Sequence, residues 1–220
     1  MRSLMKFIAP HKTIPPTPWR AEHRWQLSPA RVAILFFGLA IFGLGDSLLV
    51  QGNVGNAPWT VFAQGLSLKT GFPLGVSTFL ISVAVLLIWI PLKEKPGFGT
   101  LSNILLIATF IQVGISIFPL QHSLAMGVSF DLLGIILVGI GSSLYITCGL
   151  GPGPRDGAMT GIHQATGIRV GRVRLGIELT VLIVGRLMGG TVGVGTLLFA
   201  LLIGESIAIS LGIVARLTSR

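Results

Sequence analysis

Charged side chains are scarce in this chain of 220 residues. Only 10% of the residues are charged, whereas a soluble globular domain carries roughly 25%, and the mean hydropathy is +0.84. This deficit excludes an ordinary soluble domain. Because Cys148 is the single cysteine of the sequence, neither a disulfide framework nor a thiolate metal cluster can form within one chain.

Motifs of the common enzyme classes are also missing. The sequence has no nucleophile–base arrangement, no phosphate-binding loop, no dinucleotide fingerprint and no HExxH motif. We therefore expect no enzymatic chemistry and no cofactor. His163 has no second His or Cys at ligand spacing, so we interpret it as a polar side chain and expect no metal site.

Long apolar runs are what the sequence has instead. A helix needs about 20 mainly apolar residues to cross a bilayer. Stretches that approach this length are 30–50, 76–92, 101–118, 132–147, 175–188 and 197–215. They predict an all-α polytopic membrane protein. In such a protein the formal net charge of +9 mainly reports topology, so we expect a lipid bilayer and no nucleic acid as partner.

Residues 1–29 form a basic, proline-containing leader. This segment has no continuous apolar run, so it does not fit a secretory signal peptide. We expect a flexible cytoplasmic tail. Contact with a membrane surface or a partner through Trp19 and Trp25 is the less favoured alternative.

The second half of the sequence repeats the first. Shifted by 96 positions (134 − 38), the halves align without a gap, and glycines dominate the matches. Pro58 falls on Pro154, and the GxGT motif at 97–100 falls on the one at 193–196. A register kept across separate motifs indicates an internal duplication.

Each repeat, at 30–118 and 127–216, contains a helical segment too short to span. Segments 58–70 and 154–166 reach about 20 Å at 1.5 Å per residue, against a hydrocarbon core of roughly 30 Å. A proline begins each segment, where a helix tolerates it best, and a Thr-Gly pair ends each. We predict two short helices that are either re-entrant or interfacial.

The distribution of Lys and Arg predicts the topology. If each repeat spans three times and the N-terminus is cytoplasmic, all basic residues except Lys69 and Arg186 lie inside. If the short segments also spanned, Lys93 and Arg155 would move outside, against the preference of basic residues for cytoplasmic loops. We therefore predict six transmembrane helices with both termini cytoplasmic. Because three is odd, the repeats have inverted orientations, as in many transporters.

The stretch GLGPGPRDG at 149–157 interrupts the apolar pattern where the second short helix begins. Non-helical backbone within a membrane is tolerated only where protein buries it or where it lines a watery cavity. A helix N-terminus offers unpaired N–H groups and partial positive charge, and Arg155 adds a guanidinium. We predict that Gly153, Arg155, Asp156 and Gly157 help to bind a polar or anionic solute, with Asp156 orienting Arg155.

Polar residues also recur along one face of each short helix. Residues spaced i, i+4 and i+7 share a helix face. The candidates on these faces and in the loop before the first short helix are Asn56, Thr60, Gln64, Asp156, Thr160 and His163. They predict either a cavity lined by these groups or two amphipathic helices at the membrane interface. Periodicity does not distinguish the two.

Acids inside predicted spans are costly and are therefore candidate functional groups. Asp46 and Glu205 are candidates for proton coupling, with a structural partner or a snorkelling position as the alternative. Glu178 follows Arg174 by four residues, which predicts an intrahelical ion pair. Structural or topological roles are expected for Arg172, Arg174, Glu178, Gly193, Gly195 and Thr196.

The chain resembles the YczE-like family of bacterial membrane proteins, which is related to the YitT-type group, most strongly in its second repeat. The resemblance rests on GLGPGPRDGAMTGI, RVGRVRLGIELTV and GRLMGGTVGVGTLLFALLIG and covers about residues 32–212. It implies an integral protein of the bacterial cytoplasmic membrane, in a family whose biochemical role is poorly defined. The first repeat has Trp59-Thr60 where the second has Arg155-Asp156, so a binding site between them would be asymmetric.

These observations favour a small transporter or channel-like protein for a polar or anionic small molecule. The alternative is a non-transporting scaffold or accessory protein that holds a partner enzyme or regulator at the membrane. An intramembrane lipid-modifying enzyme ranks last because no catalytic set is present. We also expect a homodimer, formed through the glycine-lined helix faces.

Overall fold

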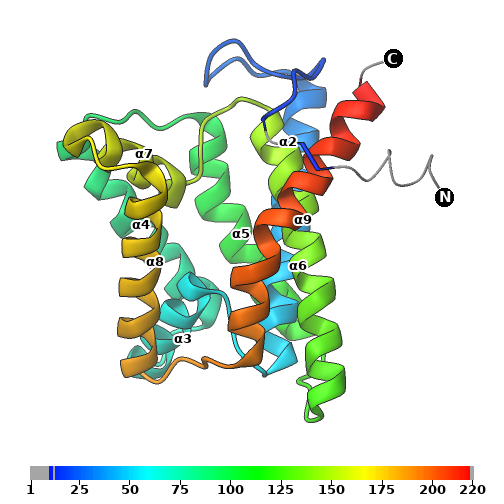
Figure 1. Ribbon diagram of the computed structural model, residues 1–220, viewed down its shortest axis with the longest axis vertical. Helices are drawn as coiled ribbons and strands as arrows, with labels where there is room; N and C mark the ends of the chain where they lie inside the picture. The colour runs from blue at the N-terminus through cyan, green and yellow to red at the C-terminus, as the bar shows by residue number, and fades with distance from the viewer. Residues whose placement is uncertain (1–9, 12, 219–220) are drawn as a thin grey trace.

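The computed structural model describes residues 10–11 and 13–218, and every regular element in that part of the chain is an α-helix. The helices are α2 (Pro29–Gly52), α3 (Pro58–Thr70), α4 (Leu74–Leu92), α5 (Phe98–Ile117), α6 (Leu124–Thr147), α7 (Pro154–Thr166), α8 (Val170–Leu187) and α9 (Val194–Thr218). Figure 1 shows the long helices running along a common direction, with α3 and α7 at opposite ends of the molecule.

The two short helices have the bounds that the sequence predicted. α3 and α7 contain 13 residues each and begin at Pro58 and Pro154. Gly71 and Gly167 follow them with φ of 76° and 73°, a region that residues with a side chain rarely adopt. The Thr-Gly signal therefore ends both helices.

Five helices in the described part of the chain are long and apolar enough to cross a membrane, namely α2, α4, α5, α6 and α9. Together with their apolar composition, they support a multi-pass membrane protein. The sixth expected span corresponds to α8, whose 18 residues reach about 27 Å. α8 differs from the other five because it carries Arg172, Arg174, Glu178 and Arg186.

Matching helices of the two repeats occupy matching places. α2 and α6 cross in opposite directions, with Gly38 against Gly141 and Gly45 against Gly134. The 96-residue shift relates Gly38 to Gly134 and Gly45 to Gly141, so the two contacts are equivalent. α2 packs on α5 as α6 packs on α9, and α3 packs on α8 as α7 packs on α4. These glycines are therefore occupied by packing within the chain and do not supply the dimer surface that we expected from them.

Hydrogen bonds in the loops recur in the same register. The N–H of Gly99 donates to the carbonyl oxygen of Leu150 at 2.8 Å, and the N–H of Gly195 donates to that of Val54 at 2.9 Å. In both cases the GxGT motif of one repeat holds the loop that precedes the short helix of the other. The two short helices are thereby fixed by reciprocal contacts.

The correspondence breaks at one helix pair. α4 packs closely on α5, whereas the matching helices α8 and α9 do not pack closely on each other. α8 instead contacts the short helices α3 and α7. Both α8 and α9 contribute residues to the lining of the cavity described below.

The N-terminal segment is folded against the helices, so the expected flexible tail is wrong for residues 13–28. The buried guanidinium of Arg31 donates to the carbonyl oxygens of Trp19, Arg20 and Gln26. The N–H of Ala21 donates to the carbonyl oxygen of Cys148 at 2.9 Å. The remaining tail positions, 1–9 and 12, lie outside the described residues.

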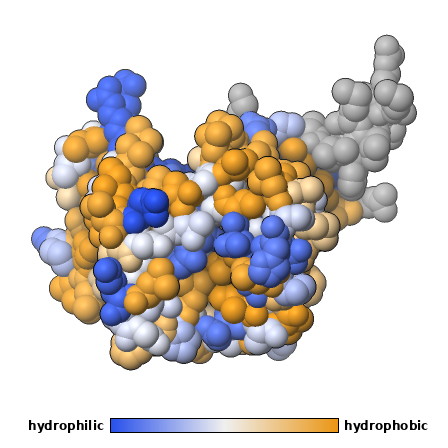
Figure 2. Space-filling model, turned by 90° about the horizontal axis from the view of Figure 1, so that it is seen from below, coloured by the Kyte–Doolittle hydropathy of each residue, from blue (hydrophilic) through white to orange (hydrophobic). Residues whose placement is uncertain are grey.

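Apolar side chains cover much of the outer surface. Leu87, Ile90, Leu105, Leu187 and Leu201 are all more than half exposed. Seen from below, hydrophobic side chains cover much of the visible face, and hydrophilic ones lie between them and at parts of the outline (Figure 2). This distribution suits a molecule surrounded by lipid.

Basic side chains gather at one end. The N-terminal segment, the α4–α5 and α7–α8 connections and the end of α9 share the upper end in Figure 1. Their basic residues include Arg20, Arg24, Lys93, Lys95, Arg169 and Arg216. Lys69 in the last turn of α3 and Arg186 in the last turn of α8 belong to the lower end.

Candidate solute-binding cavity between the repeats

A cavity of about 310 Å³ lies between the two repeats. Many lining residues form pairs related by the 96-residue shift: Phe42 with Val138, Ala57 with Gly153, Pro58 with Pro154, Trp59 with Arg155, Ser82 with Glu178, Asn103 with Phe199, and Ile107 with Ile203. The cavity is thus where equivalent surfaces of the repeats face each other. Its volume falls at the lower end of the range of small-molecule sites, about 300–1,000 Å³.

The N-termini of the two short helices meet at this cavity. The guanidinium carbon of Arg155 lies 4.9 Å from the centre of the Trp59 ring, within the range of a cation–π contact. Each residue is the second of its short helix, and the 96-residue shift relates them. The pair therefore joins equivalent positions with different chemistry, as the asymmetry of the two motifs predicted.

Arg155 keeps its hydrogen-bonding capacity unused. A guanidinium has five N–H donors, yet no hydrogen bond or ion pair joins Arg155 to any described residue. Asp46, Asp156 and Glu178 are close enough to interact with its charge electrostatically. A guanidinium that lines a cavity without an acceptor is available to a ligand.

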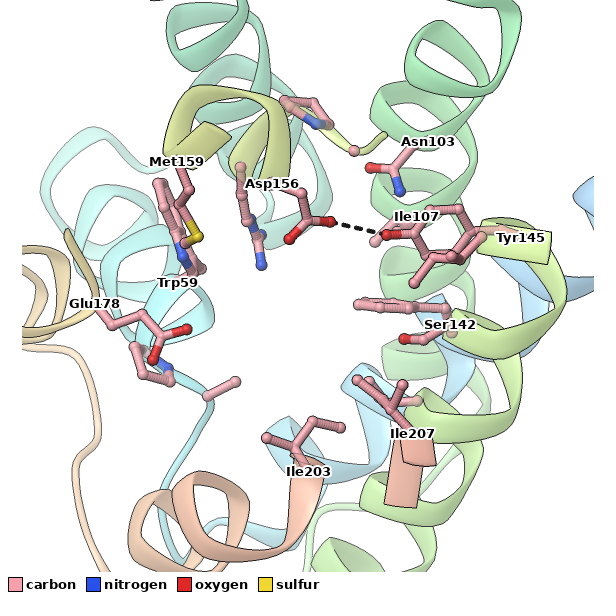
Figure 3. Close-up of a pocket in the computed structure, with 18 of the residues that line it drawn as sticks. Trp59, Asn103, Ile107, Ser142, Tyr145, Asp156, Met159, Glu178, Ile203 and Ile207 are labelled. Carbon is pink, nitrogen blue, oxygen red and sulfur yellow. Dashed lines mark hydrogen bonds between the residues drawn. The ribbon is translucent and has the colours of Figure 1, made fainter. Parts of the chain in front are cut away.

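Asp156 is held by a residue that the sequence analysis did not select. The hydroxyl of Tyr145 in α6 donates to Asp156 Oδ2 at 3.0 Å (Figure 3). The other carboxylate oxygen accepts no hydrogen bond from a residue within 13–218, and Asp156 is exposed and lines the cavity. We had expected Asp156 to orient Arg155. Instead, Asp156 accepts a hydrogen bond from Tyr145 and makes none with Arg155.

Asp46 is buried in α2 and binds the first short helix. The hydroxyl of Thr60 lies 3.0 and 2.9 Å from the two carboxylate oxygens of Asp46. The shift by 96 residues places Ser142 at the position of Asp46 and Asp156 at that of Thr60. The acid is thus on the long helix in repeat 1 and on the short helix in repeat 2.

Asn56 and Gln64 lie outside the cavity lining. Gln64 Oε1 accepts hydrogen bonds from Asn56 Nδ2 at 2.9 Å and from the N–H of Thr191 at 2.7 Å. The N–H of Asn56 donates to the carbonyl oxygen of Thr191 at 3.2 Å. These two predicted site residues tie α3 to the α8–α9 connection.

Three further candidates on α7 have local roles in the structure. A Cβ at Gly157 would lie 2.0 Å from the ring of Trp89, so the glycine lets this indole pack against the helix. Thr160 donates to the carbonyl oxygen of Asp156 at 2.9 Å. His163 Nδ1 lies 2.7 Å from the carbonyl oxygen of Ile168, where its N–H closes the end of α7. Neither Thr160 nor His163 lines the cavity.

α8 contributes the expected ion pair at the edge of the cavity. Arg174 Nε donates to Glu178 Oε1 at 2.9 Å, and both residues line the cavity. The neighbouring Arg172 is exposed. α9 supplies the apolar side chains of Ile203 and Ile207 on the side away from Asp156 (Figure 3).

The prediction of a buried acid is wrong for Glu205, which is exposed on α9 and does not line the cavity. The GxGT residues of repeat 2 also lie elsewhere. Thr196 Oγ1 accepts from the N–H of Gly193 at 3.3 Å, and Gly195 holds the loop at Val54. Their contacts are those between loops and helix ends.

Residues 29–211 match a protein family described as a family of unknown function, DUF6198. The chain belongs to this family. An uncharacterized protein of Haemophilus influenzae is 45% identical over 206 residues, which cover 94% of each chain. The uncharacterized membrane protein YczE of Bacillus subtilis is 35% identical over 183 residues, 82% of this chain and 85% of YczE. The predicted resemblance to YczE is therefore confirmed.

A second Bacillus subtilis relative, the uncharacterized protein YyaS, is 27% identical over 184 residues, 81% of this chain and 91% of YyaS. No solved structure matches the chain. The name of YczE supports a membrane location for this member of the DUF6198 family. Any activity must be argued from the geometry.

Asp131 is a buried acid of this DUF6198 member that was not among the predicted site residues. The fourth span was predicted to begin at residue 132, which left Asp131 just outside it. α6 begins at Leu124, so Asp131 lies inside the helix and is fully buried. The available signal was the apolar run on both sides of this aspartate.

Proposed function

We propose that the protein is a small membrane transporter or channel-like protein for a polar or anionic small molecule. The observation that carries the proposal is the Arg155 guanidinium, which lines a cavity of about 310 Å³ with no hydrogen bond to any described residue. Binding sites of transporters with inverted repeats lie where interrupted helices of the two repeats meet. The contact between Arg155 and Trp59 is such a meeting point.

The proposed topology has six spans in two inverted repeats, with α8 as the sixth span. The opposite directions of α2 and α6 and the reciprocal packing of the short helices support it. The concentration of Lys and Arg at the end that holds both described termini supports a cytoplasmic location of that end. Arg174 and Glu178 of α8 would then border the solute cavity and not lipid.

The cavity favours a small solute with an acidic or otherwise oxygen-rich group. A carboxylate or phosphate can accept two parallel hydrogen bonds from one guanidinium. The free oxygen of Asp156 lies in the same cavity and could accept from an amino or hydroxyl group of the solute. Apolar side chains from α9 would contact the remaining part of the molecule.

A reconstitution assay tests this function. The purified chain is reconstituted in liposomes, which are loaded in turn with unlabelled carboxylates, amino acids, phosphate esters and neutral polyols. Exchange of the enclosed compound with the same labelled compound outside is then followed. We expect exchange above protein-free liposomes for at least one compound that carries an acidic group. Exchange of no compound across these four classes, by protein that remains folded, would contradict the proposal.

The scaffold alternative also has an observation in its favour. Trp25 is 54% exposed at the upper end, beside Arg24, Lys93 and Lys95. Aromatic and Arg side chains are enriched at interaction surfaces. A stoichiometric partner that co-purifies with the wild type, and is lost in Trp25→Ala without loss of solute exchange, would assign this surface to a second role.

A further inference from the structure

Asp131 is an acid that the cavity does not use. It lies in α6, its side chain is 0% exposed, and neither carboxylate oxygen has a hydrogen-bond partner in the described part of the chain. The matching position of the first repeat, 131 − 96 = 35, holds Leu35, which is equally buried. The second repeat therefore has an acid where the first has an ordinary core residue.

Two glycines make room for this carboxyl group. A Cβ at Gly52, at the end of α2, would lie 2.4 Å from Asp131 Oδ1. A Cβ at Gly195, in the first turn of α9, would lie 1.8 Å from Asp131 Oδ2. Such distances are far below van der Waals contact, so any other residue at these positions would displace the acid. Asp131 of α6 therefore lies at the junction between the end of α2 and the first turn of α9, with a glycine against each of its carboxylate oxygens.

The junction offers no compensating charge. α2 carries Arg31 and Asp46, about 31 and 9 Å along the helix from Gly52 at 1.5 Å per residue. Asp46 is bound by Thr60. α9 carries Glu205 and Arg216, about 15 and 31 Å along the helix from Gly195, and Glu205 is exposed. The loops at 53–57 and 188–193 contain no titratable side chain, and in α6 the other titratable group, Tyr145, binds Asp156. The α5–α6 connection is bonded to the end of α2 and carries His122, whose side chain is exposed, whereas Asp131 is buried.

An ionised carboxylate in this position would be very unfavourable. Removing such an ion from water costs several kcal/mol even after the protein relaxes, and without a partner nothing offsets that cost. A buried carboxyl group in these surroundings takes up a proton and becomes neutral.

We propose that Asp131 is a proton-binding site inside the membrane domain, occupied by a proton while the first turn of α9 is packed against Asp131 and against the loop that follows α2. Release of the proton requires the first turn of α9 to move away from Asp131 and from the loop at Val54 and Gly55, so that water reaches the carboxyl group. The hydrogen bond from Gly195 to Val54 holds this junction closed. Proton binding at Asp131 does not depend on which solute the cavity binds, because Asp131 does not line the cavity.

A metal cation is the other possible occupant. A bound cation needs several oxygen ligands around it, and the described residues contain no cluster of three His, Cys, Asp or Glu side chains. The glycine backbones lie directly against both oxygens of Asp131. Space for a cation beside the carboxyl group is therefore lacking in this conformation.

Infrared spectroscopy tests the proposal on the full chain in lipid nanodiscs. Isotope-labelled aspartate shifts the carboxyl bands of Asp46, Asp131 and Asp156 alone, since these are the aspartates of the sequence. At neutral pH we expect the carbonyl band of a neutral carboxylic acid that shifts with the label. The band should shift again after transfer to D₂O, and it should disappear as the pH is raised and return when the pH is lowered.

Two matched variants assign the band. Asp131→Asn keeps the shape of the side chain and should lose the band, whereas Asp46→Asn should keep it. If Asp131→Asn fails to fold, the label-dependent band of the wild type still reports a neutral aspartic acid. The proposal is overturned if the wild type has no neutral aspartic acid at neutral pH, if the band persists in Asp131→Asn, if it never exchanges in D₂O, or if sodium or calcium ions abolish it.

Discussion

Arg155→Ala is expected to abolish solute exchange while the protein remains folded. The guanidinium makes no hydrogen bond within the described residues, so its loss removes ligand contacts and few internal ones. Hydrogen bonds to a charged group contribute about 1.5–3 kcal/mol, so we expect the affinity to fall at least about tenfold. Exchange in liposomes and the apparent affinity of the solute measure this effect.

Two further variants separate charge from geometry. Arg155→Lys keeps the positive charge but loses the planar fork, so it should restore part of the exchange with weaker binding. Arg172→Ala removes the same charge from an exposed position of α8 and should leave exchange close to that of the wild type. Wild-type affinity in Arg155→Ala would remove the basis of the proposed site.

Gly141→Ala is expected to destabilise the crossing of α2 and α6. The added Cβ would lie 2.5 Å from the carbonyl oxygen of Gly38 and 2.6 Å from the N of Phe42. Both atoms belong to the backbone, so the helices must move apart. Overpacking of this kind costs about 1–3 kcal/mol. A lower midpoint of unfolding in detergent would measure the loss.

Gly204→Ala in α9 is the matched control. A Cβ there would meet no atom within 4 Å, and replacing glycine by alanine within a helix is favourable by roughly 0.5–1 kcal/mol. We therefore expect an unchanged or slightly higher midpoint. Equal stability of the two variants would contradict the close crossing of α2 and α6.

The bounds of the short helices could be predicted because strong local signals mark both ends. Pro58 and Pro154 begin them, and the following glycines at 71 and 167 adopt the left-handed conformation that ends them. The internal repeat did not indicate which loops would meet, but the contacts between them follow its register. Gly99 with Leu150 and Gly195 with Val54 are contacts that the 96-residue register relates.

Contacts between distant side chains could not be predicted in the same way. The stacking of Arg155 on Trp59 depends on how the two short helices are placed in space, and the bond from Tyr145 to Asp156 depends on the path of α6. The docking of the N-terminal segment by Arg31 depends on backbone carbonyl groups that no sequence motif marks. Asp131 was missed because a helix boundary was placed too late.

The helical stripe on α7 had two interpretations in the sequence, and the structure divides its residues. Asp156 lines the cavity, whereas Thr160 and His163 bond to nearby backbone oxygens. When only the N-terminal part of a helix lines a site, residues on the same face can therefore have different surroundings. In α7 the lining of the cavity extends only as far as Met159.

The central claim is that the two repeats are inverted, so that their short helices approach the cavity from opposite sides. Lys69 near the end of α3 and Ala165 near the end of α7 are related by the 96-residue shift (165 − 69), and both are exposed. Single substitutions Lys69→Cys and Ala165→Cys can be labelled in a chain that keeps Cys148. That thiol is buried and burial raises its pKa to about 12, so it remains protonated and unreactive at neutral pH.

The deciding measurement is labelling of each variant in sealed membrane vesicles with a thiol reagent that cannot cross the bilayer. We expect position 69 to react from the outer side of the cell membrane and position 165 to react only when the cytoplasmic side is accessible. Reaction of both positions from the same side would contradict the inverted arrangement, and with it the proposed site between the repeats.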